Sequence, residues 1–312
     1  MFSRKTVFVL GAGANVPYGF STGITLLEKA RASSVDGLMG DAAREVTPWA
    51  RREFSQALTD NMLPSIDAML EHRRDLWPVG KRVMAALLYA EERGAHPPAD
   101  DDWMSLIFES MATDAPTASH FSGNPVTFVT FNYDRYLEYR FIRGLTARYA
   151  IDDRAAWDAL KGMGFVHVHG SLGYLPAQRP PQESNTVVPL GAPETEDTYT
   201  LGLALPLAEN SIRIVHDADP VGPGYQAART ALLAAEQVIF LGFGFGKQNV
   251  ARLQTATIQP TTPVYCTAYG MTPAEIVYSV SAAFPLHGRL EGSRVAAAPI
   301  RRFLRERIKI IR

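Results

Sequence analysis

The chain has 312 residues, of which 46% are hydrophobic, enough for a sizeable core in one large domain or two smaller ones. A formal net charge of -1 gives no overall electrostatic attraction to nucleic acid or to an anionic membrane. The single cysteine, Cys266, excludes an intrachain disulfide and a zinc site built from several cysteines. Neither a signal-peptide pattern nor an apolar run of about 18 residues is present, so we expect a soluble cytoplasmic protein without a membrane anchor.

Short β-rich runs alternate with helical patterns, which predicts an α/β fold with a Rossmann-like, mostly parallel sheet. The predicted strands are residues 6–10, 126–131, 165–168, 237–241 and 263–268. Between the first two, about residues 22–120 show i, i+3, i+4 apolar spacing and predict a large helical insertion. About residues 172–223 are rich in Pro, Gly, Glu and Thr, which predicts an irregular loop or a small subdomain. We interpret residues 1–312 as a single domain.

The first predicted strand runs into the turn Gly11-Ala12-Gly13-Ala14. Glycines at such a turn let the backbone approach a pyrophosphate, which the next helix N-terminus can hold. Tight turns also use glycine for steric reasons alone. No second strand ending in Asp or Glu follows about 20 residues later, which disfavours a conventional hydride-transfer Rossmann enzyme.

The second predicted strand, in VTFVTFNYD, ends on Asn132 and Asp134. Ligands of doubly wound sheets bind at the carboxyl ends of strands, where an amide can hold a sugar hydroxyl or a water. The alternative is that one of these two residues caps the helix that follows.

The third motif, FVHVHGSLG, carries His167 and His169 on a short strand, where alternation places both on one face. His169 lies nearer the carboxyl end and is the candidate for chemistry, whereas His167 is interpreted as a structural residue. A metal site at these histidines lacks further ligands at suitable spacing, so we predict no metal.

A fourth motif places a second glycine turn, Gly242-Phe243-Gly244, after the strand at 237–241. Facing the first turn across the sheet, it suits a ligand with two halves, and its alternative is a plain strand-to-helix turn. The basic segment RRFLRERIKIIR at the C-terminus is interpreted as a solvated surface element, or else as a docking face.

In this order the four motifs, GAGAN…YGF, FNYD, HGS and LGFGFG, resemble the sirtuin family of NAD-binding proteins over about residues 6 to 270. The resemblance implies that NAD is bound as a substrate. It implies a catalytic group of Asn132, Asp134 and His169, with Asn132 at the nicotinamide ribose or its water and Asp134 at the nicotinamide amide. The implied NAD-binding residues are Gly11, Ala12, Gly13, Ala14, Asn15, Gly19, Phe131, Gly242, Phe243, Gly244 and Thr267.

The chain also departs from the deacylating sirtuins. It lacks their four zinc cysteines, Asn15 and Phe131 stand where they have Ser and Gln, and Phe243 stands where they have Thr. Phe20-Ser21 replaces their Ile-Pro. This pattern looks more like divergent bacterial sirtuin-like proteins of antiviral defence, which destroy NAD and have a helical insertion similar to that around Asp67.

The resemblance therefore implies an NAD glycohydrolase that forms nicotinamide and ADP-ribose and acts as a regulated defence effector. Such an enzyme needs control, for which we expect a homo-oligomer or a regulatory partner protein from the same operon. The alternatives are an NAD-dependent protein deacylase without zinc, and a non-catalytic sensor of NAD or ADP-ribose.

Overall fold

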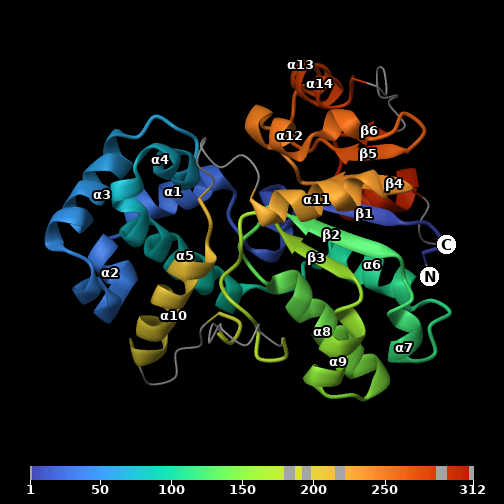
Figure 1. The fold of residues 1–312 in the computed structure, drawn as a ribbon, viewed down its shortest axis with the longest axis horizontal. Coiled ribbons are helices and arrows are strands. Elements are labelled where there is room, and N and C mark those ends of the chain that lie inside the picture. Colours follow the sequence, from blue (N-terminus) through green and yellow to red (C-terminus); the bar gives the residue numbers. More distant parts are fainter. Residues whose placement is uncertain (1, 179–186, 192–197, 215–221, 286–293, 309–312) are drawn as a thin grey trace.

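The computed structural model describes residues 2–178, 187–191, 198–214, 222–285 and 294–308. Within these residues the centre is a six-stranded parallel sheet in the order β3-β2-β1-β4-β5-β6 (Figure 1), which confirms the predicted α/β, Rossmann-like fold. The strands are β1 (Thr6–Leu10), β2 (Val126–Thr130), β3 (Gly164–His167), β4 (Gln237–Leu241), β5 (Val264–Thr267) and β6 (Val295–Ala296). The predicted strands differ from β1 to β5 by at most one residue at either end, and β6 was not predicted.

The strand order reverses beside β1. The chain extends the sheet from β1 through β2 to β3, and then adds β4 on the other side of β1. Leu10 at the end of β1 therefore pairs with Thr130 on one side and with Leu241 on the other. In open α/β sheets such a reversal creates a crevice at the carboxyl ends of the strands, and ligands bind there.

Both faces of the sheet are buried. Along β1, Val7 and Val9 join one core with α11 (Pro223–Leu233) and α12 (Lys247–Leu253). Phe8 and Leu10 face the opposite core, with α6, α8 and α9. These helices span Trp103–Ala112, Tyr136–Tyr149 and Asp153–Leu160. Two buried faces explain why the strands are hydrophobic throughout rather than alternating with polar residues.

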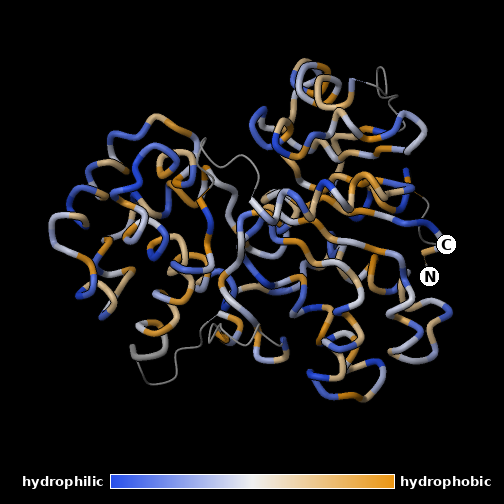
Figure 2. The backbone as a smooth tube through the Cα atoms, in the orientation of Figure 1, coloured by the Kyte–Doolittle hydropathy of each residue, from blue (hydrophilic) through white to orange (hydrophobic). Residues whose placement is uncertain are grey.

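The predicted insertion is helical, as expected, but its helices belong to two places. Helices α1 to α5 form a separate body with its own core, whereas α6 and α7 pack beneath the sheet (Figure 1). Figure 2 shows hydrophobic and hydrophilic residues alternating along the helices of this body, as one buried face requires. The helices are α1 (Gly23–Ala32), α2 (Val35–Met39), α3 (Pro48–Asp60), α4 (Ile66–His72), α5 (Trp77–Gly94) and α7 (Ala118–Phe121).

The prediction of an irregular segment at about 172–223 is wrong for part of its length. Helix α10 (Thr198–Ser211) lies in it and packs against the insertion, with Ala204, Leu205 and Ala208 in that core. Pro206 inside the helix hid the pattern, because proline normally ends a helix. Residues 172–178 and 187–191 are irregular as predicted, and residues 179–186, 192–197 and 215–221 lie outside the described part of the chain.

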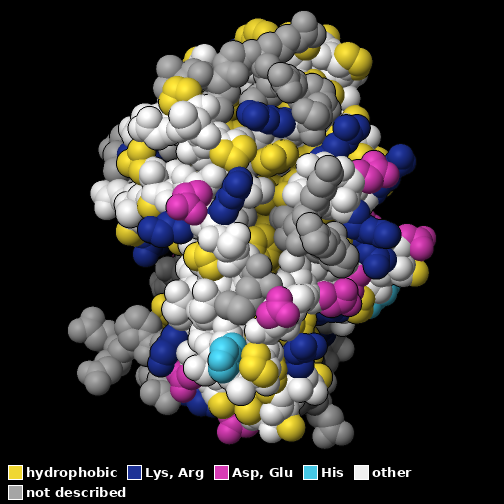
Figure 3. Space-filling model, turned by 90° about the vertical axis from the view of Figure 1, so that its right-hand side faces the viewer, with side chains coloured by type: hydrophobic (Ala, Val, Ile, Leu, Met, Phe, Trp, Pro, Cys, Tyr) yellow, Lys and Arg dark blue, Asp and Glu magenta, His cyan; other side chains and the backbone are white. Residues whose placement is uncertain are grey.

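The described C-terminal part contains short α-helices and two π-helical turns, Ile276–Val280 and Leu304–Ile308. Helices α13 (Pro273–Glu275) and α14 (Ser281–Ala283) follow β5, and α15 (Ile300–Phe303) follows β6. Basic and acidic side chains are interspersed on the face drawn in Figure 3. Among the helices of the described residues, none has the length and apolar character needed to cross a membrane.

Candidate functional site

The two glycine turns contact each other directly through their backbones. The Gly11 amide donates to the Leu241 carbonyl at 3.0 Å, and the Gly13 amide donates to the Gly242 carbonyl at 3.0 Å. A Cβ on Gly11 or Gly13 would lie 2.5 or 2.9 Å from the Gly242 oxygen. Gly242 has a φ of +57°, and a Cβ there would lie 2.0 Å from the Ala14 nitrogen. These three glycines are therefore required for the packing of the turns, whatever ligand they meet.

A cavity of about 500 Å³ lies at the carboxyl ends of β1, β4 and β5, beside the strand-order reversal. Its lining is mainly apolar and includes five predicted NAD-binding residues: Gly13, Gly242, Phe243, Gly244 and Thr267. The Thr267 hydroxyl accepts a hydrogen bond from the Gly242 amide at 2.8 Å, so that side chain also supports the turn. Apolar cavities with a few polar groups at switch points are typical ligand sites.

Six predicted NAD-binding residues are absent from the lining of this cavity: Gly11, Ala12, Ala14, Asn15, Gly19 and Phe131. Gly11 lies against the second turn, and Ala12 opens the short 3-10 turn that follows β1. Ala14 is fully buried, and its carbonyl accepts a hydrogen bond from the Trp103 indole at 2.7 Å. Gly19 has a φ of +97°, a backbone conformation that favours glycine. Gly11, Ala12, Ala14 and Gly19 all shape the backbone after β1.

Asn132 follows β2 and has an unusual environment. Both polar atoms of its side chain are buried, yet neither has a hydrogen-bond partner among the described residues. Its backbone is held on both sides: its amide donates to the Thr130 hydroxyl, and its carbonyl accepts from the His167 ring, each at 3.0 Å. Buried polar groups without partners are rare in folded proteins, so this amide is a candidate for ligand contact.

Asp134, by contrast, is fully engaged. Both carboxylate oxygens accept from the Asn15 amide at 2.9 Å, and one also accepts from the Tyr136 backbone at the start of α8. Neither residue is the N-cap of α8, which is Arg135, but Asp134 rather than Asn132 bonds the first amide of that helix. Burial raises the pKa of Asp134 to about 7, with Glu92 adding to the rise. The Asn15 side-chain oxygen is buried and has no partner in the described part of the chain, so Asn15 is a second polar group available to a ligand.

His169 lies among aromatic rings beyond the end of β3. Its ring centroid is 5.5 Å from Phe131, 6.2 Å from Tyr133 and 5.7 Å from Tyr225. Burial, and to a smaller extent the charge of Arg252, lower the pKa of His169 to about 4, so the ring is neutral at neutral pH. Its Nδ1 is buried and has no partner within the described ranges.

His167 does not share the surroundings of His169, although alternation predicted a common face. Strand β3 ends at His167, and that ring bonds the Asn132 carbonyl and, at 2.6 Å, the Glu138 carboxylate of α8. Burial opposes its positive charge, but Glu138 raises the pKa of His167 overall. The structural interpretation of His167 agrees with these contacts.

Phe131 and Phe243 connect the cavity with these polar groups. Phe243 lines the cavity, and its ring centroid lies 5.0 Å from that of Phe131, which in turn contacts His169. Two aromatic side chains, Phe131 and Phe243, therefore lie between the cavity at β4 and β5 and the polar groups after β2 and β3.

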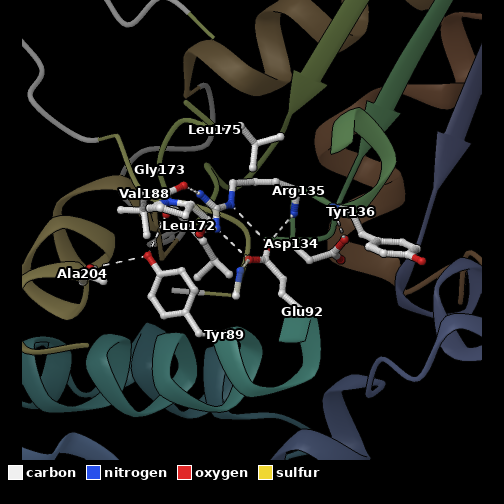
Figure 4. A network of polar contacts seen from close by, with 12 residues as sticks. Tyr89, Glu92, Asp134, Arg135, Tyr136, Leu172, Gly173, Leu175, Val188 and Ala204 are labelled. Atoms are coloured by element: carbon white, nitrogen blue, oxygen red, sulfur yellow. Dashed lines mark hydrogen bonds and ion pairs between the residues drawn. The ribbon is translucent and has the colours of Figure 1, made fainter. Parts of the chain in front are cut away.

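A buried ion pair that the sequence did not reveal fixes the loop after β2 (Figure 4). The Arg135 guanidinium bonds the Glu92 carboxylate of α5 at 2.6 Å. Arg135 also donates to the carbonyls of Val188 at 2.6 Å and Pro189 at 3.2 Å, and Glu92 accepts from the Gly191 amide at 2.8 Å. Breaking a buried pair of this kind strongly destabilises a fold, because it leaves an unpaired charge. The pair joins the insertion, the site loop and residues 187–191.

Helix α4 of the insertion also reaches the site. Asp67 accepts a hydrogen bond from the Tyr133 hydroxyl at 2.9 Å, and Glu71, one helical turn later, lies 3.5 Å from Arg252 of α12. Burial raises the pKa of Asp67 to about 6. These contacts place α4 against both the loop after β2 and helix α12, which follows the second glycine turn.

Comparison with known proteins found no matching protein-family model and no matching curated protein. The described residues contain no group of three or more His, Cys, Asp or Glu side chains that could hold a metal ion.

Proposed function

We propose that the protein is an NAD glycohydrolase, which cleaves NAD into nicotinamide and ADP-ribose. The observation that carries this proposal is the buried Asn132 amide, which has no partner among the described residues. The neutral ring of His169 contacts Phe131 and Tyr133, the two residues on either side of Asn132 in the chain. Asn132 and His169 lie where parallel strands end, close to a cavity at the strand-order reversal. A dinucleotide suits two linked subsites of this kind, one mainly apolar and one polar.

In this proposal the adenosine half occupies the cavity after β4 and β5, and the nicotinamide riboside lies toward β2 and β3. The bond between the ribose and nicotinamide breaks through a cationic, oxocarbenium-like state, which water then captures. Nicotinamide leaves as a neutral molecule, so no strong general acid is required. This chemistry fits a site whose main unpartnered groups are amides and an imidazole rather than a pair of carboxylates.

The side chains divide the work according to their contacts. The Asn132 amide orients the attacking water or the ribose hydroxyls. His169 binds a hydroxyl through its neutral ring, because a group whose pKa is about 4 is a weak base near neutral pH. The resemblance predicted that Asp134 binds the nicotinamide amide. Because Asp134 holds Asn15, we assign the nicotinamide amide to the Asn15 side-chain oxygen, which has no partner in the described part of the chain.

Destroying NAD harms the cell that makes the enzyme, so the proposal includes control of activity, as in a bacterial antiviral effector that works as an oligomer or with a partner. The contacts of α4 with Tyr133 and Arg252 support this part, since they connect the insertion with the loops around the site. A shift of α4 would change both contacts together.

The test is incubation of the purified full chain with NAD, with and without an acetylated peptide, followed by measurement of nicotinamide and ADP-ribose. We expect both products without peptide, and loss of both in Asn132→Ala. Nicotinamide release only with peptide would indicate a deacylase, and NAD binding without cleavage would indicate a sensor; either result would overturn the proposal.

A further inference from the structure

His167 makes two strong contacts that join three parts of the site. Its Nδ1 lies 3.0 Å from the Asn132 carbonyl oxygen, and its Nε2 lies 2.6 Å from a carboxylate oxygen of Glu138 on α8. Glu138 is 3% exposed, so the pair is shielded from solvent. Charge-assisted hydrogen bonds of this length are stronger and more directional than neutral ones.

The partners determine where the protons are. A carbonyl oxygen can only accept, so Nδ1 of His167 must carry a hydrogen. An ionised Glu138 also only accepts, so Nε2 carries the second hydrogen and the ring is a cation. The charged groups that face the ring are Glu138 on α8 and Asp134 in the loop after β2, and both favour this state.

The Nδ1 contact fixes the peptide unit that carries the candidate catalytic amide. The Asn132 backbone is bonded at its amide by Thr130 and at its carbonyl by His167. Its side chain has no bond to any described residue that could set its direction. The backbone contacts are therefore what orients the amide before substrate arrives.

We propose that His167 is a positioning residue: by bridging Glu138 and the Asn132 carbonyl, it sets the direction in which the Asn132 amide meets the substrate. This inference rests on the proposed function. It differs from a purely structural link between β3 and α8, because it makes turnover depend on the Nδ1 contact more than on the Nε2 contact.

Two substitutions separate the contacts. In His167→Asn the side-chain nitrogen is separated from the backbone by the same number of bonds as Nδ1, so a donor to the Asn132 carbonyl remains. In His167→Gln the nitrogen stands near the position of Nε2, so the contact with Glu138 remains and the other is lost. We expect kcat for nicotinamide release to fall by about 10- to 100-fold in His167→Gln, the cost of misplacing a reacting group. His167→Asn should stay within about threefold of wild type, with KM little changed in both.

Thermal unfolding of both variants is measured alongside. Equal kcat in the two variants, with only the melting temperature lowered, would refute the positioning role and leave a structural one. If His167→Gln does not fold, His167→Asn alone decides, because a loss of kcat as large as that of Asn132→Ala would contradict the proposal. A wild-type protein that releases no nicotinamide would refute the proposed function itself, and the role of His167 with it.

Discussion

Replacing Asn132 by leucine should make the protein more stable while abolishing its activity. The substitution keeps the branching and the number of non-hydrogen atoms of the side chain, and it removes two buried polar atoms that have no partner within the described residues. Leaving one buried polar group unpaired costs about 1–3 kcal/mol, so Asn132→Leu should raise the free energy of unfolding by about that amount. Asn124 is the matched control, because it is also buried but donates to the Met111 and Phe121 carbonyls and accepts from the Phe2 amide. Asn124→Leu should lower the free energy of unfolding by at least about 1 kcal/mol.

Urea unfolding of the three proteins measures both effects, because a shift in midpoint at constant slope reports stability. Nicotinamide release from NAD is measured on the same samples and should be lost only in Asn132→Leu. Equal destabilisation by the two substitutions would mean that the Asn132 amide is bonded in the folded protein. The argument for a ligand at this amide would then fail.

Three further substitutions test the site and its surroundings. His169→Ala should reduce turnover by about 100-fold, because the ribose hydroxyl that the ring binds would be misplaced. NAD affinity, measured by calorimetry, should change far less than turnover. Gly242→Ala should lower the free energy of unfolding by at least about 1–2 kcal/mol, which is the cost of a left-handed backbone for alanine. The loss should be larger still, because the new Cβ would lie 2.0 Å from the Ala14 nitrogen. Gly244→Ala is the control, since its Cβ would meet open space. Asp134 binds a proton more tightly in the folded state, where its pKa is about 7, than in the unfolded chain, where it is 3.8. Its contribution to the free energy of unfolding is therefore full below pH about 4 and is lost as the pH rises to about 7. Between these pH values the free energy of unfolding of Asp134→Asn should fall by up to about 4 kcal/mol less than that of the wild type. Urea midpoints that fall equally in the wild type and in Asp134→Asn would contradict this.

The fold was predictable because its signals are local. Strands buried on both faces give short apolar runs, and the turn residues at their ends mark where they stop. The missed elements lack such signals. Strand β6 has only two residues, and α10 contains Pro206, so both depend on tertiary packing rather than on local pattern.

The site was predictable only in part. Strand ends and glycine turns indicated the right edge of the sheet, since the carboxyl ends of parallel strands share one side. Sequence spacing could not show that Gly11 and Gly13 pack against Gly242, because that contact joins turns more than 220 residues apart in the chain. The Arg135–Glu92 pair was missed for the same reason, as nothing near either residue signals its partner.

Two motifs each offer a pair of polar residues two positions apart, and hydrogen bonding separates the members of each pair. Asp134 is bonded to Asn15 and to α8, whereas Asn132 has an unbonded amide in the described structure. His167 is bonded at both nitrogens, whereas the Nδ1 of His169 has no described partner. One bonded member also holds a member of the other pair, since His167 fixes the Asn132 carbonyl. A buried amide without a partner among the described residues opposes folding, and under the proposed function the bound substrate offsets that cost.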